Sequence, residues 1–387
     1  MTMTSDPAET ILANARLVLA DRVVERGWVA IAGDAIAAFG DGRAPAGGVD
    51  VRGDLVMPGL VELHTDHIEA HYVPRPKVYW NPVAAVVAYD GQIATAGITT
   101  VMDSLRVWRD EAEGDAHLLA TVLSDAIGTA RQADLLRADH FLHLRCEVPT
   151  PTVVEDASAL MTRNDIRLIS VMDHTPGQRQ FRDEEKLRTY YRGKKGGLTD
   201  AELDELFATR FEYQRKYADK NMRGVVALAQ KHKVPLASHD DTTAENVADA
   251  IRDKVAVAEF PTTVEAARGL HEAGIDILMG APNVVRGGSH SGNIAAVDLA
   301  REGMLDILSS DYIPSSLLMA ALQLPERVPG IDLAQAVRKV TKTPAAAVGL
   351  DDRGEIAVGK RADLIRVHVA AGVPAVRAVW RSGKRVA

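Results

Sequence analysis

Histidine and acidic side chains stand at the ends of several short apolar runs of this sequence. Neutral imidazole and carboxylate groups together suit a borderline divalent ion such as Zn²⁺, and Mn, Fe, Co and Ni accept the same donors. Two ions held close together can share a hydroxide of lowered pKa, which is a nucleophile for hydrolysis. The sequence therefore predicts a centre of two divalent ions, with Zn²⁺ the expected metal. The predicted ligands are His64, Asp66, Glu147, His174 and His239.

Spacing within the runs supports this set of ligands. Side chains alternate between the two faces of a strand, so His64 and Asp66 point the same way and offer two ligands from one strand. By the same rule Glu147 shares a face with Arg145, whereas Cys146 points to the other face, where we expect it to pack in the core. Because no lysine stands at a run end near these ligands, Glu147 is expected to lie between the two ions.

Asp311 follows the last apolar run and is the predicted catalytic residue. A carboxylate there can accept or orient the proton of the shared hydroxide. A single histidine at a strand end is more often a structural residue, so the prediction depends on the agreement of five run ends. Two other interpretations keep the same ligands. One is a hydrolase of C–N bonds, such as a cyclic amidase or a deacetylase, and the other is a non-catalytic metal-binding scaffold.

These side chains need a framework that brings the run ends together. Apolar runs alternate with helical segments, which is the pattern of an α/β fold built as a (β/α)₈ TIM-like barrel, where reactive groups lie at the carboxyl ends of strands. Six of the same signals would also suit a doubly wound sheet. The predicted strands span 60–63, 98–102, 140–144, 167–172, 234–237, 255–260, 275–279 and 305–308, and the predicted helices span 115–136, 201–232, 244–252, 263–273 and 293–302.

The two ends of the chain differ from its middle. Both ends hold short alternating runs broken by glycine and proline, which are typical of hairpins. We expect 1–57 and 348–387 to form one small β-sandwich, and two independent terminal hairpins are the alternative. The barrel would then span 58–347. A charged insertion at about 177–222 is expected to cover or join the site, because long insertions at this face of a barrel usually do so; a solvated helical hairpin is the other interpretation.

Composition limits the class of protein. The 387 residues carry 45 Lys and Arg against 53 Asp and Glu, a net charge of −8, which argues against a general nucleic-acid binder. No apolar run approaches the roughly 20 residues of a membrane helix. The single cysteine excludes an internal disulfide framework and predicts a cytoplasmic protein. Formation of a homo-oligomer is left open.

Two motifs carry a family resemblance. The run VMPGLVELH (56–64) resembles the first barrel strand of the amidohydrolase superfamily, and GEIAVGKRADL (354–364) resembles its return to the sandwich. The superfamily's usual His-x-His is His64-Thr65-Asp66 here, which puts an ordinary amidase or deaminase in doubt. Longer runs resemble one branch, the PhnM family of the carbon–phosphorus lyase pathway: HTDHIEAH (64–71), PRPKVYW (74–80), HLRCEVP (143–149), SVMDHTPGQRQF (170–181), LASHDD (236–241), EFPTT (259–263), LMGAPNVVRGGSHSGN (278–293) and LSSDY (308–312).

The resemblance implies an activity. Members of that family are diphosphatases, so this chain is expected to hydrolyse α-D-ribose 1-methylphosphonate 5-triphosphate to the 5-phosphate, with release of pyrophosphate, during alkylphosphonate degradation. The expected partner is this small phosphorylated ribose phosphonate. The metal centre would act on a phosphorus of the triphosphate, most simply the α-phosphorus, and Asp311 would take the proton.

Cationic residues on the same loops suit such a polyanion. Arginine binds phosphate oxygens with two parallel hydrogen bonds, and lysine supplies a point charge. The glycine-rich run that follows Arg286 can turn main-chain N–H groups toward an anion, although it lacks the ending of a nucleotide P-loop. The predicted substrate-binding residues are His67, Arg75, Lys77, Arg145, Arg179, Arg286, Ser289 and His290, and Arg182 and Lys186 lie in the same charged insertion.

Overall fold

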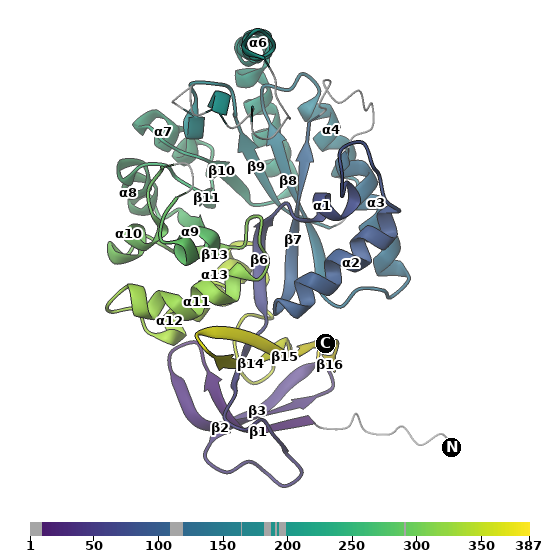
Figure 1. The fold of residues 1–387 in the computed structure, drawn as a ribbon, viewed down its shortest axis with the longest axis vertical. Helices are drawn as coiled ribbons and strands as arrows, with labels where there is room; N and C mark the ends of the chain where they lie inside the picture. Colours follow the sequence, from purple (N-terminus) through teal and green to yellow (C-terminus); the bar gives the residue numbers. More distant parts are fainter. Residues whose placement is uncertain are drawn as a thin grey trace.

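Eight parallel strands form the larger of two sheets in the computed structural model, which describes residues 10–108, 119–163, 165–181, 187–189, 192, 199–289 and 292–387 (Figure 1). Each strand pairs with its neighbour in chain order, and each overlaps one of the eight predicted runs. The prediction of a barrel is therefore confirmed. The strands are β6 (Leu60–Thr65), β7 (Ile98–Val107), β8 (Asp139–Glu147), β9 (Ile166–Met172), β10 (Leu236–His239), β11 (Val257–Glu259), β12 (Asp276–Gly280) and β13 (Ile307–Ser309).

The barrel closes where its last strand meets its first. Thr65 and Asp311 form a parallel bridge, and the main-chain N–H of Asp311 donates to the carbonyl oxygen of His64 at 3.1 Å. Apolar side chains from the strands fill the interior below this level, including Leu63, Met102 and Leu278. The open, polar end of the barrel is thus the end at which the strands finish.

Helices surround the sheet and bury a larger apolar cluster against its outer side. Several begin with a threonine or asparagine whose side chain accepts a main-chain N–H three residues later, as Asn81 does for α2. The helices are α1 (Ile68–Tyr72), α2 (Pro82–Thr95), α3 (Leu119–Gln132), α4 (Val153–Leu160), α6 (Asp200–His232), α7 (Ala244–Arg252), α8 (Val264–Glu272), α9 (Ala281–Arg286), α10 (Ala296–Arg301), α11 (Ser316–Arg327), α12 (Leu333–Arg338) and α13 (Lys342–Ala347).

Helix α6 is the main described part of the charged insertion. It has 33 residues, begins with a capping box at Thr199 and ends at Lys233, which adopts a left-handed conformation. In Figure 1 it lies at the top of the molecule, beyond the carboxyl ends of the strands. Among the described helices, α6 included, none combines the length and the apolar character needed to cross a membrane.

The two chain ends form one second sheet. Strand β5 pairs with β1 on one side and with β14 on the other, so the ends are joined and are not two independent hairpins. A side chain at Gly383 would meet the carbonyl oxygen of Gly33 at 1.9 Å, so two distant turns of this sheet pack closely together. The strands are β1 (Thr10–Val18), β2 (Val23–Ala32), β3 (Ala35–Asp41), β4 (Val49–Asp50), β5 (Leu55–Pro58), β14 (Leu364–Ala370), β15 (Val373–Arg381) and β16 (Lys384–Arg385).

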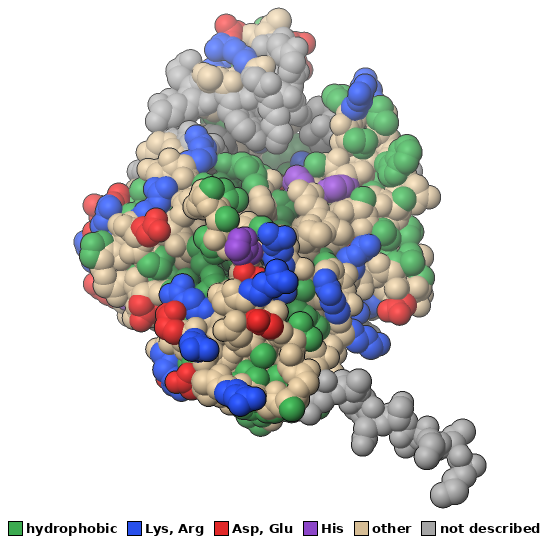
Figure 2. Space-filling model, turned by 60° about the horizontal axis from the view of Figure 1, so that its bottom comes forward, with side chains coloured by type: hydrophobic (Ala, Val, Ile, Leu, Met, Phe, Trp, Pro, Cys, Tyr) green, Lys and Arg blue, Asp and Glu red, His purple; other side chains and the backbone are tan. Residues whose placement is uncertain are grey.

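Ion pairs join this second sheet and its flanking loop to the base of the barrel. The carboxylate of Asp139, the first residue of β8, accepts a hydrogen bond from Arg353 at 2.8 Å and lies 2.7 Å from Arg361. These contacts lie at the end of the barrel opposite the polar strand ends. Figure 2 brings this end of the molecule forward and shows Lys and Arg side chains interspersed with Asp and Glu. The boundaries 57/58 and 347/348 between the two units stay a prediction.

Candidate metal centre

Three strand ends share an uncommon backbone conformation. Asp240 and Phe260 directly follow the polar tips of β10 and β11, and Asp311 stands two residues beyond the end of β13; their φ angles are 57°, 55° and 55°. Residues other than glycine rarely adopt this left-handed region, and where they do so the strain is often part of a functional site. Each of the three main-chain N–H groups donates to the next strand around the barrel. The left-handed turn therefore keeps the hydrogen bonds between neighbouring strands, while the side chains beside it lie at the polar end of the barrel.

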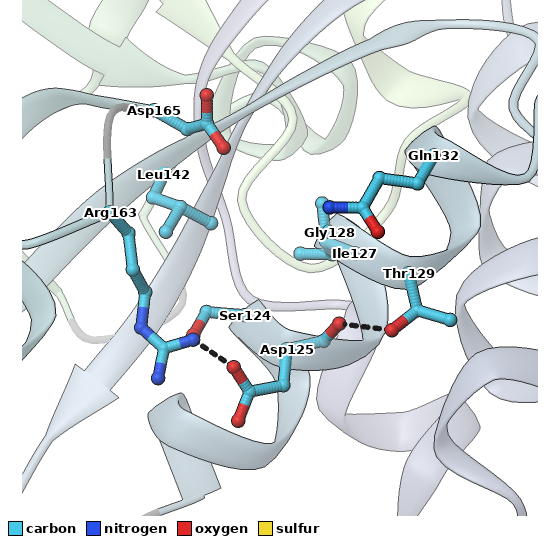
Figure 3. Close-up of a pocket in the computed structure, with 9 residues that line it drawn as sticks. All are labelled: Ser124, Asp125, Ile127, Gly128, Thr129, Gln132, Leu142, Arg163 and Asp165. Atoms are coloured by element: carbon cyan, nitrogen blue, oxygen red, sulfur yellow. Dashed lines mark hydrogen bonds and ion pairs between the residues drawn. The ribbon is translucent and has the colours of Figure 1, made fainter.

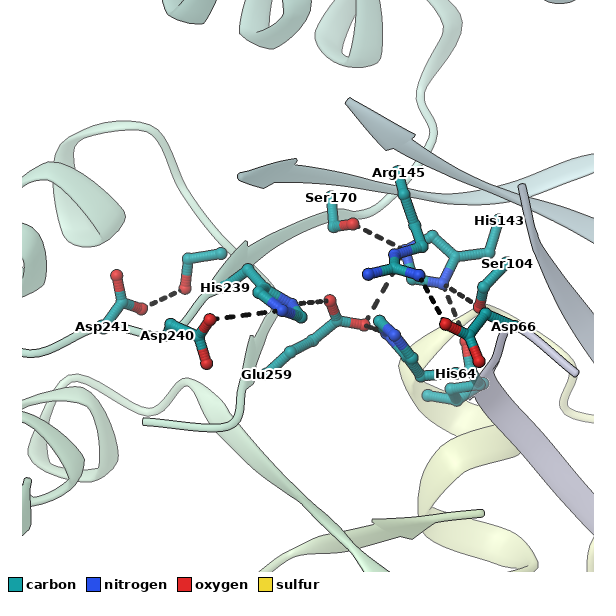
Figure 4. A network of polar contacts seen from close by, with 12 residues as sticks. His64, Asp66, Ser104, His143, Arg145, Ser170, His239, Asp240, Asp241 and Glu259 are labelled. Atoms are coloured by element: carbon teal, nitrogen blue, oxygen red, sulfur yellow. Dashed lines mark hydrogen bonds and ion pairs between the residues drawn. The ribbon is translucent and has the colours of Figure 1, made fainter. Parts of the chain in front are cut away.

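Glu259 lies between two of the predicted histidine ligands (Figure 4). Its Oε1 is 2.9 Å from Nδ1 of His64, and its Oε2 is 3.1 Å from Nδ1 of His239. All three side chains are buried. One carboxylate thus joins the tips of β6, β10 and β11, and together with the two imidazoles it forms a group of donors within 4.8 Å of one another.

A second group of donors shares His239. Its Nε2 is 3.5 Å from Oδ2 of Asp240, and Nε2 of His174 is 3.9 Å from the same oxygen. On its other side His174 is bound by Glu147, whose carboxylate accepts the main-chain N–H at 2.8 Å and lies 2.6 Å from Nδ1. Both oxygens of Glu147 therefore contact His174 here, whereas the carboxylate found between two imidazoles is that of Glu259.

Burial sets the charge of these groups. Desolvation lowers the pKa of both His64 and His239 well below the usual value of an imidazole, so both rings are neutral and can offer a nitrogen to a metal. Burial also raises the pKa of Asp240 to about 7 and that of Asp311 to about 7, the latter aided by the nearby charge of Asp66. Buried carboxylates of this kind are stabilised by a bound cation. The donor set of neutral imidazoles and carboxylates therefore fits a divalent metal ion.

Asp66 is held by an arginine in this structure. Arg145 donates to Oδ2 of Asp66 at 3.2 Å, and its side chain is largely buried while that of Asp66 is 39% exposed. The Nε atom of Arg145 is buried and has no hydrogen-bond partner among the residues that the structure describes. A buried cation with an unsatisfied donor beside the metal-binding groups is suited to an anionic ligand.

The comparison with known proteins gives the family. Residues 55–386 match the family model described as the amidohydrolase family. The chain belongs to the amidohydrolase family.

One relative and two solved structures cover nearly all of this amidohydrolase. It is 43% identical to the alpha-D-ribose 1-methylphosphonate 5-triphosphate diphosphatase of Escherichia coli (strain K12), over 97% of this chain and 100% of the relative. Among solved structures it is similar to N-isopropylammelide isopropylaminohydrolase from Burkholderia multivorans, with a TM-score of 0.65 and 18% identity over 98% of each chain. It is also similar to the ochratoxinase of A. niger, with a TM-score of 0.65 and 15% identity over 98% of this chain and 96% of that one. The family is metal-dependent, in agreement with the two donor groups.

The predicted substrate-binding residues of the amidohydrolase fall into two classes. Arg75, Lys77 and Arg286 have exposed side chains on segments that follow β6 and β12 at the polar end, and Ser289 is partly buried nearby in the chain. Arg179 instead points inward, where it donates to the carbonyl oxygen of His239 at 2.5 Å and to Asp241 at 2.9 Å. It therefore supports the tip of β10. His290, Arg182 and Lys186 lie outside the described residues.

His67 faces a polar neighbour. Its Nε2 lies 3.1 Å from Oε1 of Gln92, and His71 lies 2.9 Å from the same oxygen. Burial lowers the pKa of His67, aided by the charge of His71. One glutamine thus contacts both rings, that of His67 directly after Asp66 and that of His71 within α1.

Sequence reasoning missed Glu259 and Asp240. The run 255–260 was predicted as a strand, but its acidic tip was not counted among the candidate ligands. The motif EFPTT (259–263) contained the signal, because Glu259 ends a predicted strand in the same way as the other ligands do. Asp240 directly follows His239, and strand alternation would place it on the opposite face. Its left-handed backbone removes that alternation.

A separate hollow lies on the outside of the barrel (Figure 3). It has a volume of about 370 Å³ between α3 and the beginning of β9, which is the end of that strand remote from the metal-binding groups. Its charged side chains already have partners, since Arg163 pairs with Asp125 and Asp165 pairs with Arg131. The hollow therefore offers no free cation or carboxylate for chemistry among the described residues that line it.

Proposed function

We propose that this amidohydrolase hydrolyses α-D-ribose 1-methylphosphonate 5-triphosphate to the 5-phosphate and pyrophosphate. The observation that carries the proposal is the 43% identity to the diphosphatase of that name, over 97% of this chain and the whole of the relative. The reaction is the hydrolysis of a phosphoanhydride bond. The candidate polar groups would hold the metal, accept the proton or bind the phosphates.

Two divalent ions, with Zn²⁺ the expected metal, would be held by the two donor groups. His64, Glu259 and His239 form one group, and His239, Asp240 and His174 form the other; His239 is common to both, and its neutral ring would bind one of the two ions. A divalent ion at such a site stabilises charge on phosphoryl oxygens and lowers the pKa of bound water. Asp66 can complete the donor set when Arg145 turns to the substrate, and Glu147 orients His174 through its Nδ1–H.

Asp311 is the proposed proton acceptor. Its main chain is fixed to that of His64, and its Oδ2 lies close to the main chain of Gly280, where an added Cβ would be 3.7 Å from it. Because its pKa is raised to about 7, the carboxylate can take a proton from the attacking water near neutral pH and then release it.

Arg145, Arg75 and Lys77 are the proposed partners of the triphosphate. Arg145 lies deepest, against Asp66, and can neutralise charge close to the reacting phosphorus. Arg75 and Lys77 lie on the exposed loop between α1 and α2, where they can hold the outer phosphates. In phosphoryl transfer most of the catalytic effect comes from positioning and charge neutralisation, which is the role that these cations would have.

A panel of substrates tests the proposal. The purified protein is incubated with a ribose 5-triphosphate that carries the 1-methylphosphonate, with ATP, and with N-acyl amino sugars and cyclic amides. Hydrolysis of the ribose triphosphate at least 100 times faster than that of any amide would support the proposal. Faster turnover of an amide would overturn it, and so would the absence of any turnover in a protein that binds Zn²⁺.

A further inference from the structure

The first strand of the barrel contains a bulge directly at its polar tip. Along β6, Glu62 pairs with Val101 and Thr65 pairs with Asp103, so three steps on β6 match two steps on β7. A bulge adds a residue to one strand and changes the direction of the side chains beside it, and bulges often occur next to active sites. Here the extra residue lies within the stretch that contains His64. The bulge therefore sets where that imidazole points.

Buried side chains bind the main-chain groups that the bulge takes out of the ladder (Figure 4). Nδ1–H of His143 donates to the carbonyl oxygen of Leu63 at 2.9 Å. The N–H of His64 donates to Oε1 of Glu62 at 2.7 Å, and the N–H of Thr65 donates to the hydroxyl of Ser104 at 3.0 Å. Buried main-chain groups need such partners, and here they come from three fully buried side chains.

Glu62 has a second partner across the closure of the barrel. Its Oε2 accepts the N–H of Ser310 at 2.6 Å, while the next residue, Asp311, donates its N–H to the carbonyl oxygen of His64. Strands β6 and β13 are otherwise joined by the bridge between Thr65 and Asp311. One carboxylate thus fixes the main chain of a candidate metal ligand and, through Ser310, that of the candidate proton acceptor.

We propose that Glu62 is a positioning residue that holds His64 and Asp311 in register, with Ser104 supporting the same bulge. The inference rests on the proposed function only for the roles of His64 and Asp311. A carboxylate can accept both N–H groups because both of its oxygens are acceptors. A glutamine side chain can accept only one and must turn its NH₂ group toward the other. Glu62→Gln therefore breaks one of the two contacts while keeping the size of the side chain.

The test measures metal binding by the metal-free protein as well as catalysis by the loaded protein. In Glu62→Gln, Zn²⁺ affinity, measured by competition with a chromophoric chelator, is expected to fall about 10- to 100-fold. The loss of kcat is expected to exceed the rise in KM. The matched control is Asp90→Asn, since Asp90 is also buried and accepts two main-chain N–H groups, those of Arg137 at 2.8 Å and Ala138 at 2.9 Å, outside the site. It is expected to lower Tm without changing Zn²⁺ affinity.

A second pair of variants keeps the proposal testable if Glu62→Gln does not fold. Ser104→Ala removes the acceptor for Thr65 and is expected to weaken Zn²⁺ binding about tenfold, whereas Ser104→Thr keeps the hydroxyl and is expected to restore most of it. Unchanged Zn²⁺ affinity in Glu62→Gln and Ser104→Ala, with only a fall in Tm as in Asp90→Asn, would overturn the proposal. Weakened Zn²⁺ binding in a protein whose wild type does not hydrolyse the triphosphate would leave Glu62 as a positioning residue and overturn the function instead.

Discussion

Glu147 and His174 are joined at two points. One carboxylate oxygen of Glu147 accepts the main-chain N–H of His174 at 2.8 Å, and the other lies 2.6 Å from its Nδ1. Because the carboxylate accepts from Nδ1–H, the remaining nitrogen, Nε2, is the one turned toward Asp240 and free to bind a metal. Carboxylates that bind the second nitrogen of a metal-bound histidine fix its ring and raise its basicity. This contact therefore gives Glu147 a role even where it does not touch an ion.

Replacement of Glu147 tests that role. In Glu147→Gln the Nδ1–H of His174 loses its charged acceptor, so Zn²⁺ affinity is expected to fall about 10- to 100-fold while the protein stays folded. Chelator competition measures the affinity, and circular dichroism checks the fold. Glu155→Gln, an exposed glutamate on α4, is the control and should bind Zn²⁺ as the wild type does. An equal affinity in the two variants would show that the contact does not support the metal centre.

Asp311 is expected to accept a proton during the reaction and not to bind the metal. Asp311→Asn keeps the size and the main-chain contacts of the residue but removes the proton acceptor, so kcat should fall about 10²- to 10⁴-fold. Zn²⁺ content, measured on the same preparation, should stay at the level of the wild type. Near-normal kcat would remove Asp311 from the mechanism. Loss of Zn²⁺ would instead make it a ligand.

Arg75 and Lys77 are expected to bind substrate more than to stabilise the transition state. Both side chains are exposed on a loop at the polar end of the barrel, so their truncation should leave the fold intact. In Arg75→Ala and Lys77→Ala, KM for the triphosphate should rise about tenfold with kcat within about twofold of the wild type. Arg252→Ala, at the end of α7, removes an equally exposed arginine and is expected to have neither effect. A KM unchanged in all three variants would exclude the loop from substrate binding.

A buried histidine outside the metal centre predicts a pH dependence of stability. His140 lies between Asp103 at 2.8 Å and Asp90 at 3.3 Å. Although burial alone lowers the pKa of His140, these two carboxylates raise it to about 9. A group with a raised folded pKa stabilises the protein fully below its unfolded pKa of about 6.5, and this stabilisation is lost as the pH rises through about 9.

The size of that effect can be measured. The difference in pKa corresponds to a loss on the order of 3 kcal/mol in the free energy of unfolding between about pH 6 and pH 10. Urea unfolding of the metal-free protein over this range should show the loss in the wild type, and His140→Gln should flatten the profile by a similar amount. Parallel profiles of the two proteins would show that His140 is neutral in the folded state.

The barrel is the part of the structure that the sequence pattern predicted correctly. It follows from apolar runs of about the right length, since a buried parallel strand needs little else, and the predicted ligands His64, His174 and His239 stand within two residues of the ends of such runs. Cys146 behaves as expected: it is fully buried in the outer core, and burial raises the pKa of its thiol. In these places a local pattern decides the position of a side chain.

The remaining features depend on contacts between distant parts of the chain. Glu259 meets His64 across 195 positions of sequence, and its role is visible only when β6 and β11 face the same space. The bulge at the tip of β6 could not be read from alternation, because a bulge is the point at which alternation fails. The same holds for Asp240, whose left-handed backbone turns it back toward His174. At such places side chains take over from the neighbouring strand as hydrogen-bond partners of the main chain. The spacing of residues in the sequence then no longer predicts which way a side chain points.

Pyrophosphate release with and without metal is the decisive measurement of the proposed activity. The wild-type protein is stripped with a chelator, reloaded with Zn²⁺ or Mn²⁺, and incubated with α-D-ribose 1-methylphosphonate 5-triphosphate while products are followed by ³¹P NMR. We expect no turnover in the stripped protein, recovery on reloading, and one pyrophosphate formed for each 5-phosphate. Undiminished turnover after stripping, or release of single orthophosphates in place of pyrophosphate, would contradict it.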